Sequence, residues 1–144
     1  MRSATESGGI LRGSCLCGVV TYEIDPPFSK FAHCHCQRCR KATGAAHASN
    51  IYLAPEQLRW LTGQNDVAHF DLPAARSFAR WFCRHCGSSV PRVSRSGRTV
   101  VVPAGSLDDV PKDIPTARIF CGSEVPWACG EDGLPRFDEY PEWW

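Results

Sequence analysis

The chain contains 144 residues, the size of one ordinary domain, and 43% of them are hydrophobic, which excludes a wholly disordered protein. Sixteen Lys and Arg residues stand against fifteen Asp and Glu residues, giving a formal net charge of +1. This balance provides neither the basic surface typical of a nucleic-acid-binding protein nor an acidic block.

Residue patterns along the chain predict a mainly β domain with one short helix. We expect a flexible N-terminal tail over residues 1–12, one domain over 13–137 and a C-terminal tail over 138–144. Runs of β-branched and aromatic residues predict strands at 18–24, 50–54, 67–71, 78–82, 99–103 and 117–120. A helix is predicted at 37–42, with Gly44 at its stop. Short strands separated by eleven Pro and twelve Gly residues favour a small sandwich or open barrel.

Aromatic residues supply much of the expected core. We expect core positions for the scattered aromatic side chains Tyr52, Trp60, Phe70 and Trp127. The stretch from Pro126 onward is rich in Pro, acidic residues and Trp, and we expect an irregular strap whose aromatic side chains dock on the core. Exposure of Trp143 and Trp144 as a contact surface is the alternative.

The cellular compartment bears on how the cysteines are used. Apolar stretches such as residues 100–102 are far shorter than the about 20 residues of a membrane span. Residues 1–13 lack the apolar run of a secretory signal, so we expect a cytoplasmic protein without a membrane partner. Thiols are kept reduced there, and nine cysteines then favour metal ligation or catalysis over disulfides.

Seven of the nine cysteines fall into three tight groups: Cys15-x-Cys17, Cys34-x-Cys36-x-x-Cys39 and Cys83-x-x-Cys86. In an extended segment residues i and i+2 share a face, so the first pair can present both sulfurs to one ion. Residues i and i+3 are neighbours on a helical turn, which lets two cysteines of the triplet converge. The last pair is followed by Gly87 and has the form of a metal-binding knuckle.

Zinc suits these groups because it binds four such ligands tetrahedrally. The two pairs together supply four thiolates, the number of a closed structural site, whereas the triplet supplies three. An open coordination position is the feature that separates catalytic from structural zinc sites. Spacing alone leaves open which groups share an ion.

The triplet is the predicted catalytic group. Three thiolates leave a divalent ion at a charge of about −1, which weakens its power to acidify water and suits it to holding a thiol as its thiolate. Three cations flank the triplet and are predicted to offset its charge or bind carboxylates of an acidic thiol such as glutathione: Arg38, Arg40 and Lys41. Solvated surface positions are the alternative for these cations.

The remaining histidines and cysteines have weaker assignments. His33 and His47 are candidate nitrogen ligands or acid–base groups, with exposed positions as the alternative. His35 and His85 are expected in supporting or exposed positions. We expect the two cysteines outside the groups to be small apolar core residues, with a fourth ligand of the triplet as the lesser alternative: Cys121 and Cys129.

Taken together, these motifs resemble the glutathione-dependent formaldehyde-activating enzyme family, which includes a centromere-protein-V-like branch. The matching stretches lie at residues 13–18, 34–44, 82–88, 105–108 and 126–127. They follow one another in the order and at the spacing of the family, over residues 13 to 127.

The resemblance implies a tent-like β fold stabilised by zinc, with two zinc ions per chain. It places a structural zinc on Cys15, Cys17, Cys83 and Cys86 and a second zinc on Cys34, Cys36 and Cys39. It also implies a carbon–sulfur lyase-type activity, the condensation of formaldehyde with glutathione to S-hydroxymethylglutathione. The fold transfers more safely than the substrate, because one fold hosts many functions.

Two alternatives to this enzyme remain open from the sequence. One is a non-catalytic zinc-binding module that binds a protein partner through its aromatic strap, as the centromere branch suggests. The other is a redox or metal-handling protein, in which oxidation would join two triplet cysteines. The sequence does not define an oligomeric state.

Overall fold

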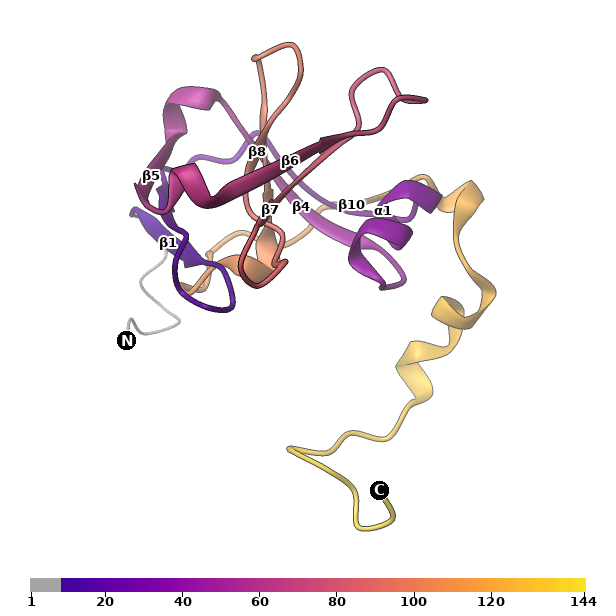
Figure 1. Cartoon of the computed structure of the whole chain (residues 1–144). Coiled ribbons are helices and arrows are strands. Elements are labelled where there is room, and N and C mark those ends of the chain that lie inside the picture. The colour runs from indigo at the N-terminus through magenta and orange to yellow at the C-terminus, as the bar shows by residue number, and fades with distance from the viewer. Residues whose placement is uncertain (1–8) are drawn as a thin grey trace.

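The computed structural model describes residues 9–144, apart from the side chains of residues 129–132. Short strands dominate this range (Figure 1). The strands are β1 (Leu11–Ser14), β2 (Thr21–Ile24), β3 (Lys30–Cys34), β4 (Ala48–Leu53), β5 (Leu58–Thr62), β6 (Val67–Asp71), β7 (Ala79–Cys83), β8 (Arg92–Val93), β9 (Val100–Pro103) and β10 (Ala117–Ile119). The α-helix is α1 (Gln37–Thr43), and the 3-10 helices are η1 (Pro55–Gln57), η2 (Gln64–Asp66), η3 (Ala104–Ser106), η4 (Cys121–Ser123) and η5 (Pro126–Gly133).

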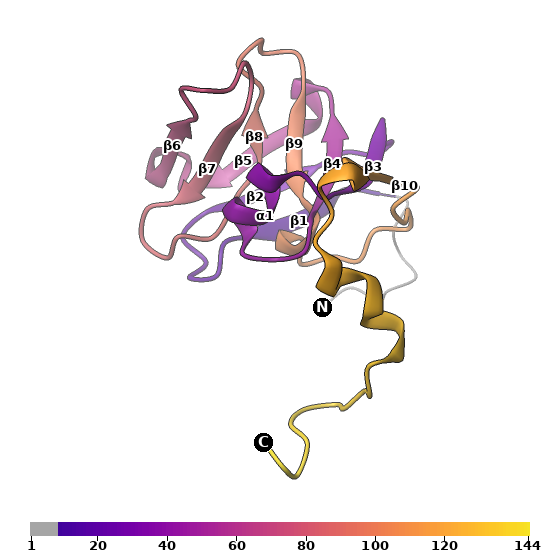
Figure 2. The ribbon, with the colours of Figure 1, turned by 90° about the vertical axis from the view of Figure 1, so that its right-hand side faces the viewer.

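The strands form three sheets. One has the order β1-β2-β5, a second has the order β10-β3-β4-β9-β8, and the third is the β6–β7 hairpin. All pairings are antiparallel except that of β10 with β3, which is parallel. Figure 2 shows the five-stranded sheet running across the molecule, with the β6–β7 hairpin beyond β8. The predicted mainly β architecture with one α-helix is confirmed for the described residues.

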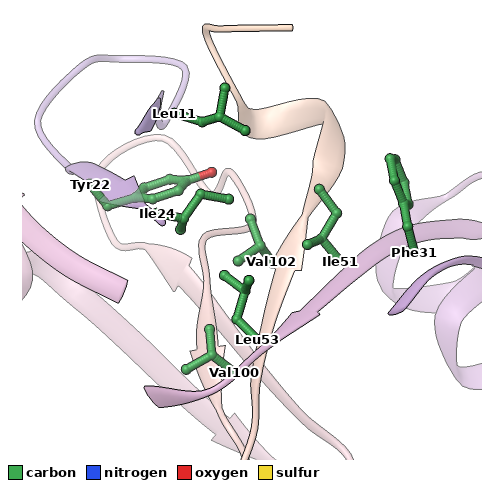
Figure 3. Close-up of a cluster of buried hydrophobic side chains, with 8 residues drawn as sticks. All are labelled: Leu11, Tyr22, Ile24, Phe31, Ile51, Leu53, Val100 and Val102. Atoms are coloured by element: carbon green, nitrogen blue, oxygen red, sulfur yellow. The ribbon is translucent and has the colours of Figure 1, made fainter. Parts of the chain in front are cut away.

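The main hydrophobic core lies between the first two sheets (Figure 3). In β2 the side chains alternate, so that Tyr22 and Ile24 are buried while Thr21 and Glu23 are only partly covered. The three valines of β9 are all buried, as expected for a strand with neighbours on both sides. The core residues are Leu11, Tyr22, Ile24, Phe31, Ile51, Leu53, Val100 and Val102.

Gly13 and Tyr22 form a close cross-strand pair in this core. They are register partners in β1 and β2. A Cβ atom at position 13 would overlap Cζ and the hydroxyl oxygen of Tyr22, so only glycine fits there. The phenol oxygen of Tyr22 hydrogen-bonds with Oγ of Ser106 in η3, which gives the buried hydroxyl a partner.

Helix α1 is short and capped at both ends. Its N-cap is Cys36, whose Sγ accepts a hydrogen bond from the backbone N–H of Cys39 at 3.2 Å. Gly44 ends the helix in the left-handed conformation (φ 67°), where a side chain would be strained. The helix predicted at 37–42 and its glycine stop are therefore confirmed.

Each of the six predicted strands coincides at least in part with an observed strand, and β6 has the predicted bounds. Four observed strands are additional, namely β1, β3, β5 and β8. Leu11 lies in β1 and is buried, so the expectation of a loose segment through residue 12 is wrong at its last two positions. Pairing with β2 orders this segment despite its Gly and Arg residues. Residues 1–8 lie outside the described residues, and apart from residues 11 and 12 the predicted division into domain and tails stays a prediction.

The segment after β10 does not form the expected strap on the core. We call residues 124–144 the C-terminal arm, and it extends away from the rest of the molecule (Figures 1 and 2). Trp127 is 66% exposed, and Phe70 on β6 is 53% exposed, so two of the four predicted core aromatics are wrong. Prolines at 126, 135 and 141 disfavour a regular strand or α-helix in the arm, which contains the 3-10 helix η5 followed by an irregular end. Tyr52 and Trp60 are partly buried. No helix in the described part of the chain has the length and apolar character needed to cross a membrane.

Candidate functional site

The two cysteine pairs converge at one end of the molecule. Cys15 and Cys17 lie in the loop after β1, while Cys83 ends β7 and Cys86 follows in the next turn. All four Sγ atoms lie within 4.8 Å of one another. Two separations are known individually, 3.6 Å between Cys15 and Cys17 and 3.8 Å between Cys17 and Cys83. The predicted grouping of these two pairs is thus present in the structure.

Both loops that carry these cysteines turn tightly with the help of a glycine. Gly18 and Gly87 adopt positive φ angles of 81° and 75°. The N–H of Gly18 donates to the carbonyl oxygen of Cys15, and that of Gly87 donates to the carbonyl oxygen of Cys83. The two loops are also joined directly, because the N–H of Leu16 donates to Oγ of Ser88 at 3.0 Å.

Local hydrogen bonds favour the thiolate at Cys15 and Cys86. At Cys17 the backbone hydrogen bond with Val19 acts in the same direction, but burial and the other three thiols outweigh it and raise the pKa to about 12. The N–H of Val20 donates to Sγ of Cys15 at 3.3 Å. Hydrogen bonding to the side chain and backbone of Ser88 lowers the pKa of the Cys86 thiol to about 5. Cysteine thiolates are the ligands that zinc prefers in structural sites.

The four-cysteine cluster fits a tetrahedral zinc ion. Zinc–sulfur bonds of about 2.3 Å place the sulfurs of a tetrahedron about 3.8 Å apart, close to the two measured separations. Cys15 and Cys83 are buried and pack with Val20 and Val90 in a small hydrophobic cluster of their own. Such a centre can hold a metal ion that ties the loop after β1 to the loop after β7.

Asp66 in η2 supports the second of these loops. Its carboxylate accepts hydrogen bonds from Nε of Arg84 at 3.0 Å and pairs with Nε2 of His85 at 2.9 Å. The N–H of Arg84 also donates to the carbonyl oxygen of Asp66. His85 is exposed and makes this supporting contact, as expected for it. Asp66 was not singled out from the sequence, because its partners lie 18 and 19 positions away, at the far end of the strand that pairs with β6.

The three remaining clustered cysteines converge at the start of α1. Cys34 ends β3, Cys36 caps the helix and Cys39 is its buried residue. Their Sγ atoms lie within 4.8 Å of one another. Within the described part of the chain, no further Cys, His, Asp or Glu side chain joins this group at that distance. The cluster can hold a metal ion with three sulfur ligands.

The three thiols differ in how easily they ionise. Burial raises the pKa of the Cys34 and Cys39 thiols. Burial acts in the same direction at Cys36, but hydrogen bonds from the Cys39 backbone and the neighbouring sulfurs outweigh it and lower the pKa of that thiol. Cys36 is therefore the thiol of the cluster that most readily becomes a thiolate.

Three histidine rings pack against one another in tilted pairs beside the three-cysteine cluster. The ring centroids of His33 and His47 are 4.0 Å apart, and those of His35 and His47 are 5.0 Å apart. Nδ1 of His33 pairs with Oγ of Ser49 at 3.0 Å, and Nδ1 of His47 lies 3.2 Å from the carbonyl oxygen of Ala48. His35 is 1% exposed, so an exposed position is excluded for it.

A cavity of about 730 Å³ lies between the two cysteine clusters. This volume is in the range of small-molecule binding sites. Cys15 of the four-cysteine cluster and Cys39 of the three-cysteine cluster both line it, as does His47. The side chains of Phe78 and Trp81 form an apolar part of the cavity wall.

Two arginines line the cavity, and neither was selected from the sequence for anion binding. Arg92 is largely buried, which lowers the pKa of its guanidinium, and it stacks 5.8 Å from the ring centroid of Phe78. Arg80 stacks 5.5 Å from the ring centroid of Phe82 and has a buried Nε without a hydrogen-bond partner. Neither has a carboxylate within 4.0 Å among the described side chains. The sequence offers one hint for Arg80. Phe78, Arg80 and Phe82 alternate with Ser77, Ala79 and Trp81, so neither face of the strand is purely apolar, a pattern that fits an arginine lining a cleft or an edge strand equally well.

The three cations selected from the sequence lie elsewhere. Arg38, Arg40 and Lys41 sit on α1 and do not line the cavity. Helix geometry explains this, because Cys39 alone of α1 is buried and its neighbours point away from it. Cys121 is exposed rather than a core residue, so that expectation is wrong, and the Cys129 side chain lies outside the described residues.

Comparison with known proteins agrees with this picture. The family model described as glutathione-dependent formaldehyde-activating enzyme matches residues 10–123. A crystal structure of a Rhodobacter sphaeroides protein has a similar fold, with a TM-score of 0.60 and 25% sequence identity over 75% of this chain and 98% of that one. None of the curated proteins searched matches the chain. The family match favours an enzyme over a non-catalytic interaction module.

Proposed function

Because the chain belongs to the glutathione-dependent formaldehyde-activating enzyme family, we propose that it is a zinc-dependent enzyme of the carbon–sulfur lyase type. Its substrates are glutathione or a closely related thiol and formaldehyde, and its product is the S-hydroxymethyl adduct. The four-cysteine cluster holds a structural zinc ion, and the three-cysteine cluster holds a second one.

One observation carries this proposal. Three sulfur atoms lie within 4.8 Å of one another beside a cavity of about 730 Å³, and Cys39 belongs to both. A closed structural site has four protein ligands, whereas catalytic sites keep a position for substrate. The cavity gives a small thiol access to that position.

When bound by Cys34, Cys36 and Cys39, zinc would supply a soft Lewis acid that holds a substrate thiol as its thiolate. The rest of the substrate is positioned by the cavity wall. Arg80 and Arg92 supply guanidinium groups for the carboxylates of glutathione, and guanidinium forks bind carboxylates through paired hydrogen bonds. Phe78 and Trp81 cover the apolar part of the peptide.

His47 is placed to move a proton in the cavity. When Nδ1 donates to the carbonyl oxygen of Ala48 at 3.2 Å, Nε2 is left as an acceptor. The thiol gives up its proton, and the sulfur forms a bond to the carbonyl carbon of formaldehyde. The π electrons of the carbonyl move onto its oxygen, which takes up a proton to give the hydroxyl group. The reverse sequence breaks the carbon–sulfur bond and releases both substrates.

The test is the rate at which ¹³C-formaldehyde exchanges with its glutathione adduct, measured by two-dimensional exchange NMR against the spontaneous reaction. We expect zinc-loaded protein to accelerate the exchange, and His47→Gln to reduce that acceleration by about 100-fold or more. The exposed-cysteine variant Cys121→Ser should match the wild type, because its side chain lies outside the cavity. An exchange rate equal to the spontaneous one, from protein shown to contain two zinc ions, would reject the proposed reaction.

A further inference from the structure

The C-terminal arm presents a large unpartnered aromatic surface. Six of its apolar side chains are exposed: Trp127 (66%), Leu134 (65%), Phe137 (49%), Tyr140 (76%), Trp143 (74%) and Trp144 (80%). Exposed apolar surface of this kind marks interaction sites, and Trp and Tyr are enriched among the residues that dominate binding. The family reaction gives this surface no role.

Four of these side chains are already organised as a cluster at the tip of the arm. The ring centroids are 6.4 Å apart for Phe137 and Trp143, 6.0 Å for Tyr140 and Trp144, and 5.9 Å for Trp143 and Trp144. The N–H of Trp144 donates to the carbonyl oxygen of Pro141, which closes the tip into a turn. A preformed aromatic group loses less conformational entropy on binding than a flexible one.

Charge distinguishes the arm from the rest of the chain. Residues 124–144 contain six Asp and Glu residues and one Arg. Residues 9–123 contain fourteen Lys and Arg residues and eight Asp and Glu residues. An acidic arm and a basic body of the same chain are complementary, so a second copy of the chain offers the surface that the arm fits.

Helix α1 carries cations that are available for such a contact. Arg38 and Lys41 are exposed and Arg40 is partly exposed, and none of the three has a carboxylate within 4.0 Å among the described side chains. They do not line the cavity, so the proposed reaction leaves them without a role.

Strand β10, which precedes the arm, lies beside the three-cysteine cluster and the start of this helix. Ile119 packs against the cluster of Cys34 and Cys39, and the N–H of His35 donates to the carbonyl oxygen of Ile119. From that point the arm runs away from its own body (Figures 1 and 2). The aromatic tip therefore does not contact its own α1.

We propose that two copies of the chain form a dimer by exchanging C-terminal arms. Each acidic arm packs along the α1 side of the other copy, opposite Arg38, Arg40 and Lys41, and its aromatic tip is buried against that body. The exchange is reciprocal, as in a two-fold symmetric interface, so both arms and both helices are used at once. The proposal holds whatever reaction the cavity performs.

The test is the molecular mass of the zinc-loaded full chain in solution, measured by sedimentation velocity and multi-angle light scattering from 1 to 100 μM. We expect a dimer whose dissociation constant increases with salt concentration, because the interface is charged. Replacing the tip tryptophans together, Trp143→Ser and Trp144→Ser, should weaken the dimer by about tenfold or more. Lys41→Glu should weaken it as well.

Two controls make the result specific. Phe70→Ser removes an aromatic side chain that is 53% exposed on β6, away from the arm, and should leave the dimer intact. Circular dichroism and zinc content establish that each variant is folded. The proposal is overturned if the wild-type chain stays monomeric to 100 μM. A monomer whose arm folds back on its own body would overturn it in the same way. It is equally overturned by a dimer that persists unchanged in the double tryptophan variant.

Discussion

The Sγ atoms of Cys17 and Cys83 lie 3.8 Å apart, although 66 positions separate the two residues in the chain. This contact joins the loop after β1 to the loop after β7, which belong to different sheets. A metal ion shared by the two loops would therefore act as a long-range cross-link. Since the site does not exist in the unfolded chain, the free energy of metal binding becomes free energy of folding.

If the four-cysteine cluster holds the proposed structural zinc, loss of one of its buried cysteines should destabilise the whole fold. Cys83 is 0% exposed, and we expect Cys83→Ser to lower the free energy of unfolding by about 4 kcal/mol or more. The melting temperature, followed by circular dichroism, should fall by about 10 °C or more. A strong chelator should have a similar effect on the wild type. Cys121→Ser is the matched control and should melt like the wild type, and equal melting of both variants would contradict a structural metal.

The three-cysteine cluster should behave differently, and Cys36→Ser tests this cleanly. Serine is a good N-cap residue, so its hydroxyl can replace Sγ as acceptor for the N–H of Cys39 and keep α1 capped. We expect the variant to keep its circular dichroism spectrum while its zinc content, measured by elemental analysis, falls from two ions to one. A variant that unfolds, or one that keeps both ions, would contradict the separation of a structural site from a substrate site.

Substrate anchoring should depend on the cavity arginines rather than on those of α1. Hydrogen bonds to charged groups contribute about 1.5–3 kcal/mol, so Arg92→Met should raise KM for glutathione by about 10- to 100-fold. Arg80→Met should have a similar but separate effect. Arg38→Met is the matched control, because Arg38 does not line the cavity. If steady-state kinetics show a larger increase in KM for Arg38→Met than for the cavity variants, the carboxylates of glutathione bind the α1 cations, as the sequence suggested.

The free energy of unfolding should depend on alkaline pH through the buried phenol of Tyr22. Burial raises its pKa above the ordinary value of 10.0, so the folded state keeps a proton that the unfolded state loses. The protonated phenol therefore contributes its full share of the free energy of unfolding below pH 10. That share is lost as the pH rises from 10 through the raised pKa of Tyr22 in the folded state. Between pH 10 and 12 the wild type should lose about 1.4 kcal/mol per pH unit relative to Tyr22→Phe, in urea unfolding. Parallel curves for the two proteins would show that Tyr22 ionises freely in the fold.

The close approach of Gly13 to the ring of Tyr22 predicts the effect of one methyl group. Gly13→Ala should cost about 1–3 kcal/mol of stability, because the ring is fixed in the core and cannot move aside. Gly105→Ala is the control, since a Cβ atom there meets nothing within 4 Å. Urea unfolding that shows equal stability for both variants would mean that the β1–β2 pair relaxes more easily than its packing suggests.

The sequence predicted the parts of the fold that depend on local pattern. Strand β6 and helix α1 follow from β-branched residues and from a glycine stop, both of which act over a few residues. Strand β3 has the sequence KFAHC and little β propensity of its own. It is a strand because β4 and β10 supply hydrogen bonds on both sides, which no local pattern records.

In the candidate site, too, some residues could be predicted from local sequence pattern and others depend on tertiary packing. Tight spacing identified the cysteine clusters, because neighbouring thiols in sequence are close in any compact turn. The cavity arginines lie on β7 and β8, far from the triplet in the chain. The five-stranded sheet, which contains both β3 and β8, places Arg92 at the same cavity as Cys39, and the packing of the β6–β7 hairpin places Arg80 there. Proximity in sequence suggested Arg38, Arg40 and Lys41 instead, but the helix directs them away from the cavity.

The most direct test of the account is a native mass spectrum of the full chain, purified without chelators and titrated with glutathione. The account predicts two zinc ions per chain and a glutathione adduct that is absent in Cys36→Ser. A spectrum with one zinc ion and no adduct at millimolar glutathione would contradict it, because the three-cysteine cluster would then hold neither the metal nor the thiol.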